Sequence, residues 1–220
     1  MLMTTKRACA ASNWHKECNL SHELLTALRE NTHAMHQALD HHPMMARLLQ
    51  PELTATTYAN TLAWLHPLQT VLEGHLAKLL STYASHLELA SRVAALNDDL
   101  ERLNTQPYQL PDDIQLEIQR TLTPSLGTVA GMLYVLNGAR LGSAHIARRL
   151  QYTSPDLPSR YFAEANGEIH WPYTLKLIDH LENYEYSDCT SAAEAVFRWY
   201  IKVMNSAQQD AVCQTVCGYT

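Results

Sequence analysis

Apolar residues recur at intervals of three and four along most of the chain, the spacing that places them on one face of an α-helix. One such run spans 21–40, where Leu24 and Leu28 follow a candidate N-cap at Ser21. Pro67 lies inside another run and is expected to kink or split its helix. The further runs predict helices over 54–81, 86–103, 112–122, 124–151, 172–183 and 191–209, with a short element at Tyr161 and Phe162.

This pattern predicts an all-α fold made of one multi-helix domain. Glycine is scarce, with seven in 220 residues, whereas leucine and alanine dominate long segments. Residues 1–20 show no clear periodicity and are expected to form a loose arm. The helical domain is expected over 21–209, followed by a frayed tail over 210–220.

Charge and composition exclude several classes of function. The net charge is −6 and no basic tract is present, which argues against nucleic acid as a partner. No stretch approaches the ~20 apolar residues of a membrane span. The five cysteines are odd in number and lack zinc-type spacing, and no secretory segment is visible. Reduced thiols and a cytoplasmic location are therefore expected.

The helix predicted over 124–151 contains four of the seven glycines, at 127, 131, 138 and 142. At 3.6 residues per turn these positions share one face. Each glycine costs a helix about 1 kcal/mol relative to alanine. This face is therefore expected to meet something closer than a side chain permits, and both another helix and a flat ligand remain open as that partner.

Histidines gather in the first predicted helix, and His36 is placed best among them for ligation. It lies four residues after Thr32 and is expected to point with the apolar stripe. A neutral imidazole in an apolar pocket is a good axial ligand for haem iron. The alternative is a histidine at the edge of the core that is satisfied by a hydrogen bond. His33, His41 and His42 are expected to be solvated.

Two motifs carry a resemblance to a known family. The run LRENTHAMHQALD, residues 28–40, resembles the proximal helix of the haem oxygenases, and LYVLNGARLGSAHI, residues 133–146, resembles their distal helix in its bacterial, biliverdin-producing form. The closing AAEAVFRWY, residues 192–200, is similar in a weaker way. The resemblance covers roughly residues 24–205.

The resemblance implies that haem is clamped between these two helices as both cofactor and substrate. His36 falls on the axial iron ligand and Gly138 and Gly142 on the distal glycines, with Ser143 beside them as a further catalytic candidate. Members of the family open the ring with O2 and external electrons to biliverdin, CO and free iron. A separate reductase or ferredoxin is implied, because the chain has no G-x-G-x-x-G motif. By placement, Arg29, Lys176 and Lys202 are candidates for binding the haem propionates.

Three residues depart from the family pattern. Asn137 replaces a frequent glutamate, Ala139 replaces the aspartate that organises water in the animal enzymes, and Ser143 replaces a second glycine. Distal water would then be held by the Gly138 carbonyl or by Ser143. The departures motivate an alternative, a non-catalytic haem carrier or sensor, and a third hypothesis keeps the fold without haem, as in thiaminase-like folds. Arg140 is expected to be solvated, and His145 is expected to be packed or hydrogen-bonded.

Overall fold

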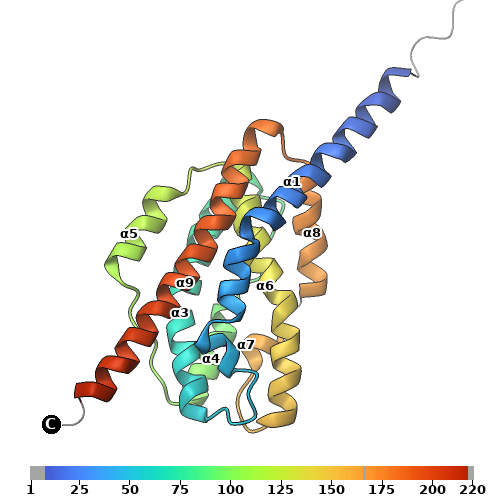
Figure 1. Cartoon of the computed structure of the whole chain (residues 1–220). Helices are drawn as coiled ribbons and strands as arrows, with labels where there is room; N and C mark the ends of the chain where they lie inside the picture. The colour runs from blue at the N-terminus through green and yellow to red at the C-terminus, as the bar shows by residue number, and fades with distance from the viewer. Residues whose placement is uncertain (1–7, 166, 218–220) are drawn as a thin grey trace, which may run out of the picture.

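A computed structural model describes the backbone of residues 8–165 and 167–217 and the side chains of 23–165 and 169–209. Helices make up 77% of the chain and no strand occurs in the described residues, which confirms the all-α fold. The elements of Figure 1 are α1 Ala8–Asp40, α2 Pro43–Arg47, α3 Ala55–Tyr83, α4 Val93–Arg102, α5 Asp112–Thr121, α6 Leu126–Thr153, α7 Arg160–Ala163, α8 Gly167–Asp179, the 3-10 turn η1 Asn183–Glu185, and α9 Tyr186–Cys217.

The first and last helices of the chain extend beyond their predicted ends. α1 begins at Ala8, so the segment 8–20, expected as a loose arm, continues the helix and projects past the bundle (Figure 1). α9 likewise continues to Cys217, and only 1–7 and 218–220 of the predicted arm and tail lie outside the described residues. α3 runs through Pro67 without being split, since its buried flanks offset a lost backbone hydrogen bond.

Two loop regions also differ from the sequence prediction. α4 begins at Val93 rather than near residue 86, because the backbone N–H of Arg92 donates to the Glu73 carboxylate at 3.0 Å instead of continuing a helix. His42, expected in solvent, is buried, and its Nδ1 accepts the N–H of Met44 at 3.3 Å to cap α2.

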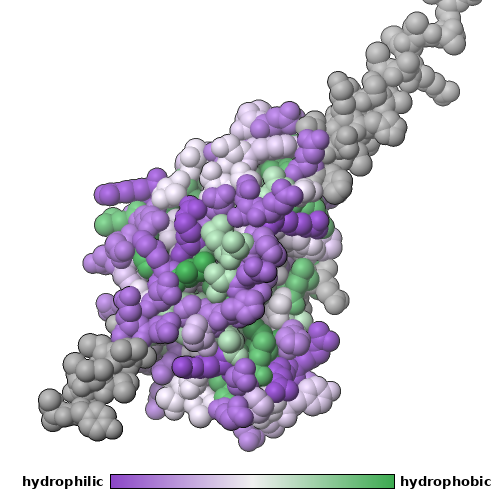
Figure 2. Space-filling model, in the orientation of Figure 1, coloured by the Kyte–Doolittle hydropathy of each residue, from purple (hydrophilic) through white to green (hydrophobic). Residues whose placement is uncertain are grey.

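α6 and α9 form the centre of the bundle and pack along each other. α1 packs on α9 and α8, and α6 also packs on α8, but α1 and α6 share no extensive contact with each other. The core residue Trp199 of α9 is fully buried, as are Leu62, Leu68 and Leu72 of α3. Figure 2 shows that the face carrying α1 and α9 is mostly polar, with apolar side chains visible only in small groups. No helix in the described part of the chain has the length and apolar content that crossing a bilayer requires.

Candidate functional site

The four glycines of α6 form two pairs with different surroundings. Gly127 and Gly131 lie against η1 and the start of α9. A Cβ at either position would overlap a main-chain carbonyl oxygen, that of Glu185 or that of Cys189. Because main chain cannot rotate aside as a side chain does, only glycine permits this approach. For this pair the partner is therefore another helix, one of the two possibilities that the sequence left open.

The second pair, Gly138 and Gly142, meets no helix backbone in the described structure. A Cβ on Gly138 would reach only the indole of Trp171, at an ordinary 3.5 Å, and a Cβ on Gly142 would find no atom of another element within 4 Å. Trp171 comes from α8, and its ring is tilted against Tyr134 with 5.6 Å between centroids. His145, expected to be packed or hydrogen-bonded, is exposed one turn further on. Packing thus does not explain the two glycines, and their main chain is open.

His36 lies at the edge of the buried stripe of α1, not within it. The stripe passes through Leu24, Leu28 and Thr32, whereas the His36 side chain is 61% exposed. Its apolar neighbour is Phe197 of α9, with 5.8 Å between the ring centroids. The expectation that His36 points with the apolar residues is therefore corrected to a histidine that touches them on one side.

The two ring nitrogens of His36 have different environments. Nδ1 is 2.9 Å from Oδ2 of Asp40, one turn further along α1. When Nδ1–H donates to that carboxylate, the lone pair of the neutral ring lies on Nε2. Among the described residues, no hydrogen bond involves Nε2 and no hydrogen bond, ion pair or ring contact joins His36 to α6. The histidine and the open glycines therefore lie on two helices that share α8 and α9 as neighbours.

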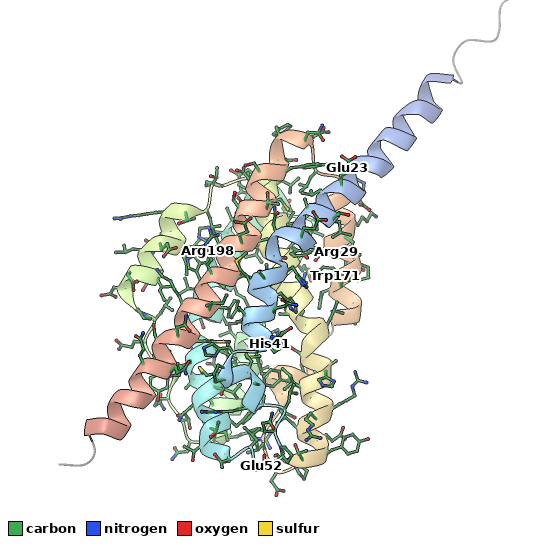
Figure 3. All side chains as sticks on the ribbon, viewed as in Figure 1. Glu23, Arg29, His41, Glu52, Trp171 and Arg198 are labelled. Atoms are coloured by element: carbon green, nitrogen blue, oxygen red, sulfur yellow. The ribbon has the colours of Figure 1, made fainter. Side chains whose placement is uncertain are left out.

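The three cationic candidates are placed differently. Arg29 and Lys176 are both exposed, and they come from α1 and α8, which pack on each other. Figure 3 shows Arg29 on α1 next to the helix that carries Trp171. Lys202 instead contacts α5, where its Nζ is 2.7 Å from Glu117 and 3.7 Å from Asp113. Lys202 is thus engaged elsewhere, whereas Arg29 and Lys176 have no recorded side-chain partner among the described residues.

Arg140 is buried, which contradicts the expectation of a solvated arginine. It is 3% exposed; its Nε donates to Asn137 Oδ1 at 3.0 Å and its Nη1 to the Ala165 carbonyl at 2.9 Å, while Nη2 donates to the Ala90 carbonyl. Burial, reinforced by the nearby charge of Arg92, lowers the pKa of Arg140 to about 10. The side chain therefore remains a cation at neutral pH in the interior.

Ser143 is buried in the same polar cluster. Its Oγ accepts a hydrogen bond from Arg92 Nη2 at 3.0 Å and donates one to the Ala139 carbonyl at 3.1 Å. The Ser143 side chain is buried, whereas Gly142 is exposed. The hydroxyl is thus engaged by the protein, and the structure gives no support to Ser143 as a residue that touches a ligand.

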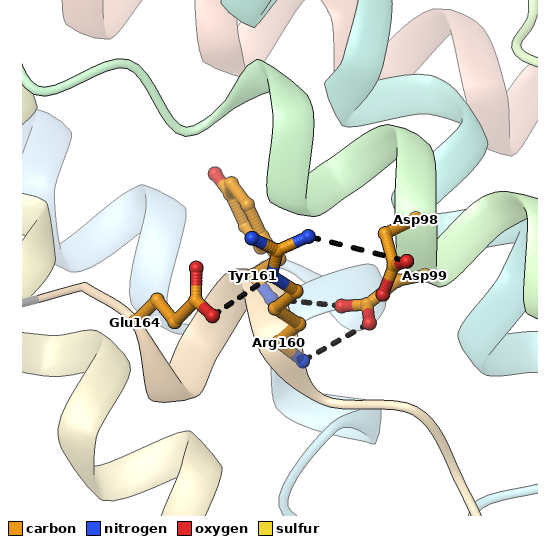
Figure 4. A network of polar contacts seen from close by, with 5 residues as sticks. All are labelled: Asp98, Asp99, Arg160, Tyr161 and Glu164. Carbon is orange, nitrogen blue, oxygen red and sulfur yellow. Dashed lines mark hydrogen bonds and ion pairs between the residues drawn. The ribbon is translucent and has the colours of Figure 1, made fainter.

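Carboxylates hold this cluster in place. Glu73 of α3 accepts the Arg92 N–H and the Ser91 hydroxyl, the latter at 2.5 Å. Asp99 accepts the backbone N–H groups of Arg160 and Tyr161 at 3.0 and 2.8 Å, which fixes the start of α7 (Figure 4). Burial raises the pKa of Asp99, and these two N–H donors oppose the increase.

The sequence reasoning missed Arg92, Glu73 and Asp99. One available signal was that Glu73 lies beside Leu72 and near Leu76 in a helix whose neighbours are buried. A carboxylate at such a position needs partners. The partners themselves could not be identified, because Arg92 reaches across to Ser143, which is 51 residues away.

Comparison with known proteins identifies similarities over most of the chain. The family model described as "Heme oxygenase" matches residues 22–206. A "Heme oxygenase" of Xanthomonas campestris pv. campestris is 36% identical over 117 residues, which cover 52% of this chain and 65% of that relative. The match thus spans slightly less than two thirds of the relative's length.

Two solved structures share the fold. The NO- and CO-bound heme oxygenase of Neisseria meningitidis aligns with a TM-score of 0.63 at 20% identity, over 84% of this chain and 91% of that one. Heme oxygenase-1 of Synechocystis, solved in complex with heme, aligns with a TM-score of 0.64 at 15% identity, over 90% and 99%.

Proposed function

The chain belongs to the haem oxygenase family, and on that premise we propose that it opens haem with O2 and external electrons, releasing biliverdin, CO and free iron. Haem serves as both cofactor and substrate in this proposal: when bound, it supplies the iron at which O2 is reduced. The protein supplies ligation, orientation and electrostatics.

Three features of the described residues support a porphyrin site. The open main chain at Gly138 and Gly142 lets a flat plate approach α6 more closely than side chains would allow. Nε2 of His36 is a suitable iron ligand, and the Asp40 carboxylate on Nδ1 supplies the outer hydrogen bond that usually orients such a ring. The indole of Trp171 lies beside Gly138, and the ring of Phe197 lies beside His36.

Each predicted site residue has a role in the proposal. His36 would hold the haem iron, and the main-chain carbonyls and amides around Gly138 and Gly142 would hold water beside the haem. Arg29 and Lys176, on two packed helices, neutralise the two propionates. The third catalytic candidate, Ser143, acts through the helix rather than on the haem, because its hydroxyl is bonded to Arg92.

The electron donor is proposed to be a separate reductase or ferredoxin, since the chain carries no dinucleotide motif of its own. A cytoplasmic location is proposed with it. The composition supports this location through an odd set of cysteines, of which Cys189 is a buried free thiol. Burial raises the pKa of that thiol to about 12, so it stays protonated and inert.

The open pair Gly138 and Gly142 is the observation that carries the proposal, because packing leaves it unexplained. The test is to titrate the protein with haemin, then add a reductant and O2. Loss of the Soret band with a new absorbance in the red is the expected result. A bound haem that persists unchanged would instead identify the carrier or sensor, and no binding at micromolar haemin would leave only the shared fold.

The axial ligand is tested with His36→Ala. This variant should lose the spectrum of a histidine-ligated ferric haem, and added imidazole should restore it by occupying the space of the missing ring. His33→Ala, on the exposed side of the same helix, is the matched control. An unchanged spectrum in His36→Ala would show that another residue ligates the iron.

A further inference from the structure

We propose that Arg92 and Arg140 are positioning residues that fix the bend and the rotation of α6 at Gly138–Gly142, so that this main chain is held in one conformation. The proposal deepens the haem site proposed above and rests on it. It assigns the buried arginines to the haem-facing turn, although neither arginine faces that side of α6.

The burial pattern of α6 shows why such residues are needed. The first half of the helix buries almost every side chain, whereas between residues 138 and 149 the buried side chains are Arg140 and Ser143. The open glycines therefore lie in a stretch with few apolar contacts, because Ile146 and Ala147 are only partly buried against the core. Two glycines also make this stretch intrinsically less helical, so the two polar anchors add to these contacts in fixing its conformation.

The first anchor sets the bend. Arg92 donates to Ser143 Oγ, and Oγ donates to the Ala139 carbonyl, four residues earlier. A hydroxyl bonded in this way shares the acceptor of a helical N–H and bends the helix. Because Arg92 occupies an oxygen lone pair, it leaves the hydroxyl proton for Ala139. This hydrogen bond lies in the turn that contains Gly138 and Gly142, and the proposal therefore puts the bend there.

The second anchor sets the rotation. Arg140 donates to Ala90, before α4, and to Ala165, before α8. It also donates to Asn137, whose Nδ2 donates to Thr174 Oγ1 of α8 at 3.0 Å. One turn of α6 is thus tied to three separate segments, which opposes its rotation about its axis.

Both anchors depend on the same short segment, 90–92. The Ala90 carbonyl accepts a hydrogen bond from Arg140. The Arg92 side chain donates to Ser143 Oγ and, at 2.8 Å, to the Tyr161 carbonyl. Glu73 holds the segment through the Arg92 N–H and the Ser91 hydroxyl. Burial and the charge of Arg92 lower the pKa of Arg140, whereas the Glu73 carboxylate raises it. Buried charges add little net stability even when they are paired, so the proposal assigns to this cluster conformational specificity.

The anchoring also explains two departures from the family pattern. Asn137 bridges Arg140 to α8, and Ser143 connects Arg92 to the Ala139 carbonyl. Asn137→Glu, which restores the frequent family residue, is expected to keep the anchor, because a carboxylate accepts from Arg140 at least as well as an amide does. Asn137→Leu is expected to release it.

The first test uses the protein without haem. Arg140→Met should accelerate amide hydrogen exchange over residues 139–147 by about tenfold, the scale expected for lost hydrogen bonds to a charged donor, and leave 128–135 unchanged. Arg160→Met removes a half-exposed arginine and is the matched control. If Arg140→Met does not fold, Arg140→Lys is used in the same comparison. Unchanged exchange, or equal acceleration along all of α6, would overturn the proposal.

The second test measures how the protein surrounds a ligand bound to the haem. In the ferrous CO complex, Ser143→Ala should shift the C–O stretching frequency, and Ser143→Thr, which keeps the hydroxyl, should leave it at the wild-type value. Identical frequencies in Ser143→Ala and wild type would refute the first anchor. A chain that binds no haemin would refute the proposed function, while the exchange measurement would still decide whether the arginines hold this turn.

Discussion

The orientation and basicity of the His36 imidazole depend on a carboxylate that is itself exposed. Its Nδ1 is paired with Asp40, and each side chain is 61% exposed. A carboxylate on the second nitrogen makes a histidine ligand more basic and orients its ring, typically worth about 10–100-fold in metal affinity. Solvent screens this pair, so the effect here is expected at or below the lower end of that range.

Two substitutions separate the charge of Asp40 from its hydrogen bond. Asp40→Asn keeps an acceptor for Nδ1–H and should raise the reduction potential of bound haem with little loss of haemin affinity. Asp40→Ala removes both and should weaken haemin binding by up to about tenfold. Haemin titration and potentiometry measure the two effects, with Glu30→Gln on the same helix as control. Equal potentials in wild type and Asp40→Asn would contradict the role of the charge.

Local spacing predicted part of the picture at the residue scale. Helical periodicity placed the four glycines on one helix, which is α6, but it also placed His36 with the apolar stripe, whereas that side chain is 61% exposed. Arg140 was misplaced in solvent because arginine is rarely buried. Its acceptors, Ala90 and Ala165, lie 50 and 25 residues away, and no local pattern indicates such partners.

At the scale of elements, the two halves of α6 predict opposite effects of the same substitution. Gly131→Ala would force a Cβ into the Cys189 carbonyl, and overpacking of this kind costs about 1–3 kcal/mol. Gly142→Ala meets no atom and should gain up to about 1 kcal/mol of helix propensity. Thermal melts should thus show a lowered Tm for the first and an unchanged or raised Tm for the second.

Haemin affinity should rank these two variants in the opposite order to their Tm. Gly142→Ala places a methyl group where the porphyrin is proposed to lie and should weaken haemin binding, whereas the folded fraction of Gly131→Ala should bind normally. Gly138→Ala is expected to resemble Gly142→Ala, since its Cβ would make only an ordinary 3.5 Å contact with Trp171. Full haemin affinity in Gly142→Ala would remove the main support for a ligand on this face.

The existence of the helices was predictable, but several of their ends were not. α6 was expected from about residue 124 to 151 and spans Leu126–Thr153, with Ser125 as a local N-cap that accepts the Thr128 N–H. α4 starts at Val93 because a distant carboxylate, Glu73, captures the preceding N–H. Ends set by capping residues can be identified from sequence, whereas ends set by tertiary hydrogen bonds cannot.

At the scale of the whole molecule, the arrangement of helices around α6 and α9 was not predictable from periodicity, which gives each helix a buried face but no partner. The motif resemblance supplied the topology instead, and the fold agrees with it. Pairings such as that of α6 with α9 became clear only from the structure, in the contact at Gly127 and Gly131.

The stability of the whole molecule is expected to decrease as the pH falls below about 6.5, the ordinary pKa of histidine. Burial lowers the pKa of His42, His75 and His170 in the folded protein. Below pH 6.5 the unfolded chain therefore binds protons that the folded chain does not, and the unfolding free energy drops with pH until the folded pKa values are passed. Above that range the three rings are neutral in both states.

The dependence of the unfolding free energy on pH has a slope, and a substitution can show how much one of these rings contributes to it. His75 lies on α3 with Nε2 buried and without a described partner, so His75→Gln should reduce the loss of unfolding free energy between pH 7 and 5. His33→Gln, at an exposed position of α1, is the matched control and should leave the slope unchanged. Urea unfolding at several pH values measures it. A slope that is the same in His75→Gln and wild type would mean that His75 contributes nothing to acid instability, and the remaining loss would then have to come from His42, His170 or the carboxylates that titrate below them.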